Sequence, residues 1–296
     1  MKKVRYFERP KKYWEGHVFP MKKMQLLKDR ISVDFEVEFN EPEALPEGAV
    51  ELTHDADFLS RIDSYFKNPE ASYGEFEARC DSDVFENECR AVAGTLSSCR
   101  DALNQGWGFN IGGGLHHSFP DHGEGFCIIN DVAISINQLR KEKVIKKAAV
   151  IDLDVHQGNG TAVCFQGIPE VTTISIHQQN NYPSWKPKSD LDLGLADGTG
   201  DDEYLLQLSK SLEWLSKYSK PDLILFLAGA DPYRKDQLGG LSLTKKGLEA
   251  RDKRVFNWAR DNNCPVSVVL AGGYAKDVND VVDIHFNTFK CLMEVY

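Results

Sequence analysis

The sequence predicts an α/β fold in which helices flank a central parallel sheet. Short, nearly all-apolar runs recur along the chain, and segments with helical spacing separate them. Strands that helices cover on both faces are apolar throughout, and alternation of strand and helix is typical of a doubly wound parallel sheet. The 296 residues, of which 42% are hydrophobic, suffice for one such core, so residues 1–296 are expected to form a single domain.

The first predicted element is a strand over residues 31–39. Its odd positions, from Ile31 to Phe39, are apolar and its even positions are polar, which is typical of a half-buried strand. The acidic side chains on its polar face disfavour further pairing, so this strand is expected at a sheet edge. Residues 40–48 contain two prolines and three glutamates and are predicted to be an exposed connection.

The core strands and the helices follow. Four runs, each nearly all apolar, are predicted to be buried strands: residues 148–153, 171–176, 223–227 and 266–270. A shorter run over 108–111 leads into three glycines. Helices are predicted at residues 88–103, 130–141, 201–218 and 244–262 from apolar spacings of three and four, with Thr244 capping the last.

Charge and cysteine content exclude several classes of function. The net charge of −10 disfavours direct binding of nucleic acid or anionic membranes and would attract a cationic substrate. The seven cysteines form no C-x-x-C pair, so neither a disulfide framework nor a cysteine zinc site is indicated, and a reducing compartment is expected. The chain shows no signal-peptide pattern and no apolar run of about 18 residues, which makes the cytoplasm the expected location.

Polar side chains directly follow three of the predicted core strands. Asp154 and His156 follow the first run, Asp231 follows the run at 223–227, and Tyr274 follows the last. In a parallel sheet flanked by helices, ligands bind just beyond the carboxyl ends of the strands. These side chains are therefore the first candidates for a functional site.

Asp154, His156 and Asp231 are the candidate metal ligands. Residues two apart in an extended segment face the same side, so Asp154 and His156 can meet one ion, and Asp231 would be the third ligand. Two carboxylates and one imidazole with an open position suit a catalytic divalent metal. A solvated turn at the strand end is the alternative for this Asp-x-His motif.

Four other residues are candidates for proton transfer. The adjacent His116 and His117 follow three glycines and would place two imidazoles in one site, although metal ligation and a neutral buried pair are alternatives. Asp152 is expected to accept an N–H from one of them, with a helix cap or a simple salt bridge as the alternative. Tyr274 could donate its hydroxyl to a developing oxyanion, or lie exposed in a turn.

Four motifs occur in a fixed order along the chain: GGGLHHSFPDHGEGFCIIN at 112–130, IDLDVHQGNGT at 151–161, AGADP at 228–232 and LAGGY at 270–274. Together they resemble the histone deacetylase family, including its bacterial deacetylase-like, class IV and acetylpolyamine amidohydrolase branches. The segment HVFPMKK at 17–23 is similar to the family's N-terminal segment, so the resemblance covers nearly the whole chain. It implies the arginase/deacetylase-like fold.

The resemblance also implies a division of roles. Asp154, His156 and Asp231 would bind zinc, with ferrous iron as the alternative metal. Tyr274 would be the transition-state hydrogen-bond donor. His116 would pair with Asp152, and His117 would be the principal general base and acid.

Further residues match the family's substrate channel and a potassium site. Gly125 and Phe126 match one wall of the channel, and the opposite wall is not identified from the sequence. The implied structural K⁺ would be held by Asp152, by Ser175, and by the backbone around Asp154, His156 and Ile176.

Asn159 departs from the best-known nuclear members, which have a second aspartate at this position. An amide supports an imidazolium less than a carboxylate does. His117 is therefore expected to be less basic than it would be beside an aspartate.

The expected function is metal-dependent removal of acetyl or other acyl groups from acylated lysine in proteins. An acylated polyamine or other small acylated amine is the alternative substrate, and histones are not specifically implied. A two-metal ureohydrolase of the arginase type is disfavoured because Gly158 and Tyr233 stand where further carboxylates are needed. A non-catalytic acyl-amine-binding or scaffold protein is the remaining rival. The sequence sets neither the acyl length nor the oligomeric state.

Overall fold

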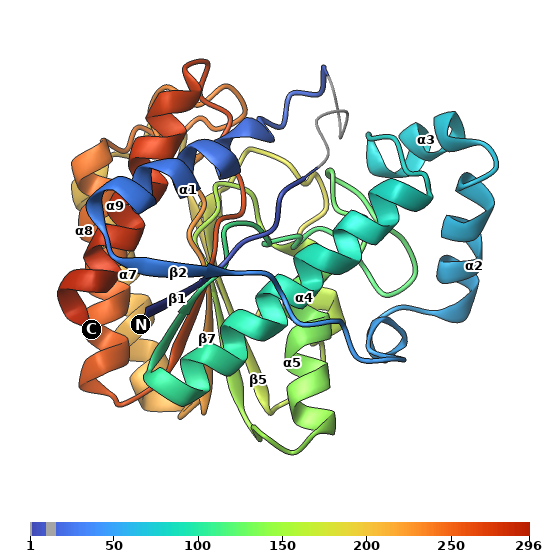
Figure 1. Ribbon diagram of the computed structural model, residues 1–296. Helices are drawn as coiled ribbons and strands as arrows, with labels where there is room; N and C mark the ends of the chain where they lie inside the picture. Colours follow the sequence, from blue (N-terminus) through green and yellow to red (C-terminus); the bar gives the residue numbers. More distant parts are fainter. Residues whose placement is uncertain (1, 10–15) are drawn as a thin grey trace.

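A six-stranded parallel sheet forms the centre of the molecule (Figure 1). The structure is a computed structural model, and it describes residues 2–9 and 16–296. The strand order is β3-β8-β7-β4-β5-β6, and every neighbouring pair is parallel. The strands are β3 (Trp107–Phe109), β4 (Ala148–Asp152), β5 (Val171–Gln178), β6 (Leu191–Leu195), β7 (Leu223–Leu227) and β8 (Val266–Val269). The predicted α/β class is confirmed.

Helices cover both faces of this sheet (Figure 1). One face carries α4 (Ser82–Gln105) and α5 (Asp131–Lys141). The other carries α7 (Asp201–Tyr218), α8 (Lys245–Asp261) and α9 (Val278–Val295), with α1 (Lys22–Asp34) packed on α9. The shorter helices are α2 (Ala56–Tyr65), α3 (Tyr73–Phe76), α6 (Asn159–Cys164) and the 3-10 turns Val50–Leu52 and Pro69–Ser72.

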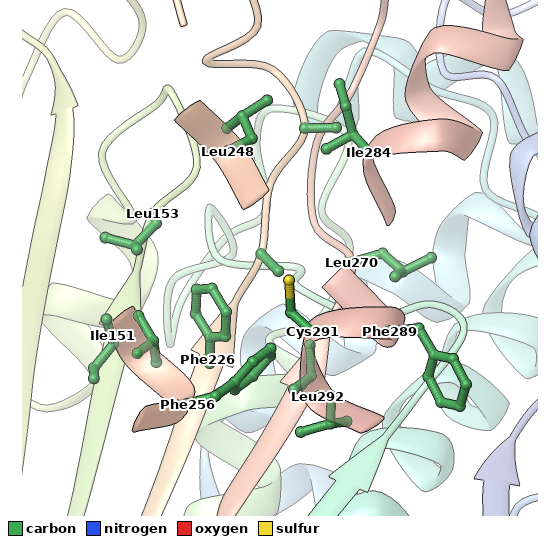
Figure 2. Packing of buried hydrophobic residues seen from close by; sticks show 14 of the residues in the cluster. Ile151, Leu153, Phe226, Leu248, Phe256, Leu270, Ile284, Phe289, Cys291 and Leu292 are labelled. Atoms are coloured by element: carbon green, nitrogen blue, oxygen red, sulfur yellow. The ribbon is translucent and has the colours of Figure 1, made fainter. Parts of the chain in front are cut away.

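Alternate residues of each buried strand supply the two cores. In β4, Ala148 and Val150 pack with α4 and α5, whereas Ala149 and Ile151 pack with α7, α8 and α9. Figure 2 shows the second core, in which Ile151 lies with aromatic and aliphatic side chains of β7, α8 and α9. Burial on both faces explains why β4 and β7 are apolar over nearly their whole length.

The parallel register places the candidate residues at one edge of the sheet. Asp152 at the end of β4 pairs with Leu227 of β7 and with Ser175 of β5, and Leu227 pairs in turn with Val269 of β8. The segments that follow β4, β7 and β8 therefore emerge side by side. This alignment brings together residues far apart in the sequence.

The predicted strand at 31–39 is wrong over its first half. Helix α1 continues to Asp34, and Ile31 is buried while Val33 is 82% exposed. The apolar residues of α1 recur at helical spacing, and this pattern overrides the local alternation. The second half does form β2 (Val37–Asn40), which pairs in parallel with β1 (Lys2–Arg5) in a separate two-stranded sheet.

Most other predicted elements appear within one or two residues of their expected bounds. The helix predicted to start at residue 88 begins earlier, at Ser82, because the Asp81 side chain caps it by accepting from Val84 N at 3.0 Å. Residues 41–48 contain no helix or strand, as predicted. No helix in the described ranges is long and apolar enough to cross a membrane.

The first prediction concerns His54, which links two buried loops. Its Nδ1 donates to Phe119 O at 2.9 Å and its Nε2 accepts from Asn130 N at 3.0 Å. Burial lowers the pKa of His54 from 6.5 to about 4, so the unfolded chain binds a proton first as the pH falls. This contribution to stability is complete above pH 6.5 and is lost progressively towards pH 4, by up to about 3 kcal/mol.

Denaturant unfolding of the wild type and of His54→Gln at several pH values tests this. The wild type should lose more stability on acidification than the variant. Equal losses in both proteins would contradict the assignment.

Candidate active site

Asp154, His156 and Asp231 form a buried cluster. One ligand atom from each lies within 4.8 Å of the others, and the three residues are at most 7% exposed. His156 Nδ1 lies 3.0 Å from Asp154 Oδ1 and 3.5 Å from Asp231 Oδ2. The alternative of a solvated turn is therefore wrong.

Backbone N–H groups hold both carboxylates in place. Asp154 accepts from Gly272 N at 2.7 Å and from His156 N at 3.0 Å, and Asp231 accepts from Val155 N at 2.8 Å. Any side chain at Gly272 would collide with both aspartates. The glycine in the LAGGY motif is thus required by close packing against the cluster.

The cluster fits a divalent metal ion by its chemistry. Asp231 Oδ2 is buried and makes no hydrogen bond within the described chain. Burial and the neighbouring Asp154 charge raise the pKa of Asp231 to about 7. Ionising both carboxyl groups of the cluster therefore costs free energy when no cation is bound. A divalent cation would offset that repulsion, and two oxygens with one imidazole nitrogen suit zinc or ferrous iron.

The two adjacent histidines are each held at Nδ1 by a different partner. His116 Nδ1 donates to Asp152 Oδ2 at 2.7 Å, and His117 Nδ1 donates to Asn159 Oδ1 at 2.7 Å. Their ring centroids lie 4.0 Å apart, and both residues are buried. Asp152 therefore contacts His116, as the sequence predicted, and Asn159 lies directly behind His117.

The surroundings give these histidines opposite charge states. Burial disfavours the charged form of His116, but the Asp152 and Asp154 carboxylates outweigh it and raise the pKa of His116 to about 9. Burial, together with the charges of His116 and His156, lowers the pKa of His117 well below 6.5. Near neutral pH, His116 is protonated and His117 is a neutral ring.

The loop that carries the histidines is anchored by Asp131. Residues 112–114 have positive φ angles of 152°, 73° and 89°, which favour glycine. The Asp131 carboxylate accepts from Gly114 N at 3.0 Å and Leu115 N at 2.6 Å. Sequence reasoning missed this residue, although an acidic residue in the first turn of a predicted helix was visible.

Tyr274 lies beside the cluster and is only 8% exposed, so the exposed-turn alternative is wrong. Its ring lies 6.5 Å from the ring of His156. Asp236 accepts from Tyr274 N at 2.6 Å, and Gln237 Nε2 donates to Tyr274 O at 2.6 Å. Burial and the nearby carboxylates of Asp154 and Asp231 raise the pKa of Tyr274 well above 10, so its hydroxyl keeps its proton.

A cavity opens onto His117, His156 and Tyr274. Gly125 and Phe126 line it, and a side chain at Gly125 would place Cβ 2.7 Å from His117 Cδ2. An adjoining hollow shares His117, Gly125 and Phe126 with this cavity and is also lined by Tyr182 and Leu238, and the Tyr182 ring lies 4.9 Å from that of His117. Tyr182 follows β5, so its place after a predicted strand was a usable signal.

Comparison with known proteins now decides the family. Residues 17–289 match the histone deacetylase domain. This chain belongs to the histone deacetylase family. It is 37% identical over 285 residues to an uncharacterised protein of Picosynechococcus sp., with 95% of each chain covered.

Two further comparisons are consistent with this family and its fold. A probable deacetylase of Methanothermobacter thermautotrophicus is 27% identical, with 88% of this chain and 81% of the relative covered. The crystal structure of acetylpolyamine aminohydrolase from Burkholderia pseudomallei has the same fold, with a TM-score of 0.80, 17% identity, and coverage of 100% of this chain and 99% of that one. The chain is a deacetylase-family hydrolase with a buried Asp-His-Asp cluster that fits a metal site.

The potassium site implied by the family resemblance stays a prediction. Ser175 lies opposite Asp152 in the paired strands β5 and β4, with Ile176 next along the strand. Ser175 Oγ is within 2.9 Å of His177 Nδ1. The guanidinium group of Arg251, which sequence reasoning did not single out, lies near these residues. Arg251 is fully buried and donates to Leu153 O at 3.2 Å and to Gly229 O at 2.6 Å.

The second prediction concerns the metal cluster. Wild-type protein should bind one equivalent of Zn²⁺ per chain in competition with a chromophoric chelator. Asp231→Asn removes one charged ligand and should weaken binding by more than about 100-fold, since even residues behind metal ligands are worth 10–100-fold.

Asp261→Asn is a matched control. Asp261 is exposed, pairs with Arg260, and is the last residue of α8 rather than part of the metal cluster. It should bind zinc as the wild type does. Unchanged affinity in Asp231→Asn, or two equivalents in the wild type, would contradict a single site at this cluster.

Proposed function

We propose that the protein hydrolyses the amide bond of N-acylated lysine in proteins, with acetyl-lysine as the first substrate to test. One observation carries this proposal: Asp154 and His156 of the metal cluster, together with His117 and Tyr274, line one cavity. We also propose that residues 1–296 act as a single catalytic domain.

The metal ion, when bound to Asp154, His156 and Asp231, would polarise the substrate carbonyl and increase the acidity of water. The chain's own residues would do the rest. Because His117 Nδ1 donates to Asn159, its Nε2 is the basic nitrogen, and the ring lines the cavity. His117 Nε2 would take the proton of the attacking water.

Two other groups would stabilise the developing negative charge and complete the proton transfer. The Tyr274 hydroxyl would donate a hydrogen bond to the carbonyl oxygen as negative charge develops on it. The proton now on His117, with the charged His116 beside it, would pass to the departing amine. Asp152 would keep His116 oriented through its 2.7 Å contact.

The walls of the cavity fit an uncharged acyl chain and a slender linker. Phe126 and Tyr182 would enclose the apolar part, and the net charge of −10 would favour a cationic remainder. An acylated polyamine is the second candidate substrate, favoured by the fold shared with the acetylpolyamine aminohydrolase. A two-metal site is disfavoured, since a Cβ at Gly158 would collide with Asp152 Oδ2 and leave no room for a carboxylate.

The third prediction tests the reaction itself. Zinc-loaded wild type should release free amine from acetyl-lysine peptides in a panel that also contains longer acyl-lysines and acetylated polyamines, measured by mass spectrometry. Faster turnover of the polyamines would select the second substrate class. No turnover of any member would favour an acyl-amine-binding protein.

The fourth prediction concerns Tyr274→Phe. Loss of the hydroxyl removes a donor that acts mainly in the transition state, so kcat should fall by about 100-fold or more while KM changes little. Steady-state kinetics on the best panel substrate measures this. Tyr218→Phe, at an exposed position, is the control, and a kcat of Tyr274→Phe equal to that control would refute the role.

The fifth prediction concerns pH. The pKa of His117 is well below 6.5, so the acid limb of kcat/KM should lie below that pH in the wild type. In Asn159→Asp, a carboxylate would stabilise the charged ring and raise its pKa, so the acid limb should move to higher pH. The exposed Asn262→Asp adds the same charge at a distance and should leave the profile unchanged.

A further inference from the structure

We propose that Glu124 is a positioning residue for His117 and that it acts through the side-chain amide of Asn159. The proposal rests on the function proposed above, in which His117 is the base. Glu124 belongs to the loop that also carries Gly125 and Phe126, and its side chain is 30% exposed. It reaches inward to the fully enclosed Asn159.

The Asn159 amide makes three hydrogen bonds that together define its orientation. Its Oδ1 accepts from His117 Nδ1 at 2.7 Å and from Gly160 N at 3.0 Å. Its Nδ2 donates to the Glu124 carboxylate. The amide therefore presents its oxygen to the histidine and its NH₂ to the glutamate.

This orientation determines which nitrogen of His117 is basic. With an amide oxygen facing Nδ1, that nitrogen must carry the hydrogen, and Nε2 keeps its lone pair. A reversed amide would present its NH₂ to Nδ1 and favour the opposite tautomer. Gly160 N and the Glu124 carboxylate enforce the same orientation, and the bond to Glu124 is the charge-assisted one.

Glu124 also accounts for the asparagine at position 159. A carboxylate at 159 would face the Glu124 carboxylate across the same contact, and two carboxylates that share a contact do not both ionise easily. Glu124 with Asn159 is therefore a matched acceptor and donor pair. The complementary pair would be a glutamine at 124 with an aspartate at 159.

A rival role for Glu124 is to shape the channel wall. It lies close enough to Tyr182 that, after burial, its charge is the largest influence raising the pKa of that tyrosine. A wall role would affect substrate binding and hence KM. A positioning role would affect kcat, because His117 acts in the chemical step.

The test is a double-mutant cycle on zinc-loaded full-length protein. Glu124→Ala should lower kcat by about 10-fold or more, with KM changed less than about 2-fold, since a general base contributes 10²–10⁴-fold. Glu124→Gln should retain much of the activity, because its side-chain oxygen can still accept from Asn159. In the Asn159→Asp background the sign should reverse, and Glu124→Gln should raise kcat by supplying a donor.

Tyr182→Phe separates the two roles, since it alters the wall beside Glu124 and leaves Asn159 in place. Its effect should appear mainly in KM, whereas that of Glu124→Ala should appear in kcat. If Glu124→Ala raises only KM, or if Glu124→Gln has the same effect in both backgrounds, the proposal is wrong.

A second measurement does not depend on turnover. Nitrogen-15 NMR of labelled histidines should show His117 with its hydrogen on Nδ1 in the wild type and a mixture of tautomers in Glu124→Ala. An unchanged tautomer in that variant would overturn the positioning role. Inactivity of the wild type on every substrate would instead count against the proposed function, while the tautomer shift would still support the link from Glu124 to His117.

Discussion

The structure depends on the burial of two carboxylates, Asp154 and Asp231, side by side at the edge of a parallel sheet. Such a pair is costly without compensation, and several neighbouring groups supply it. Backbone N–H groups of Gly272 and Val155 donate to the pair, and the His156 ring lies against both carboxylates. Lys23 is fully buried and donates to Ala271 O in the LAGGY segment at 2.9 Å. It adds a further positive group beside that segment.

The buried charges influence the protonation states of the neighbouring side chains. Asp154 and Asp152 hold His116 in its charged form, and the charge of His116 then helps to keep His117 neutral beside it. Burial and the carboxylates of Asp154 and Asp231 keep the Tyr274 hydroxyl protonated. A neutral imidazole and a protonated hydroxyl thus lie in one cavity, which is the arrangement that the proposed base and hydrogen-bond donor require.

Strong local patterns made the core and most candidate residues predictable. The apolar strands are buried on both faces, and Asp154, His156, Asp231 and Tyr274 each follow one of them, so the parallel register alone brings them together. The strand predicted at Ile31 failed because tertiary packing on α9 selects a helix there.

The residues that sequence reasoning missed support the site from a distance. Asp131, Asp236 and Arg251 act on backbone groups, and such contacts depend on how loops far apart in sequence approach each other. Tyr182 faces His117 only because the loop after β5 folds back over the cavity. No spacing rule within one segment predicts contacts of this kind.

The separate anchoring of the two histidines makes the site modular. The partner of His116 comes from the end of β4, whereas the partner of His117 comes from the start of α6 and is itself held by a residue 35 positions earlier. None of the contacts behind His117 involves a metal ligand. The basicity of His117 can therefore drift in evolution, or be adjusted by design, without changing the Asp154, His156 and Asp231 cluster.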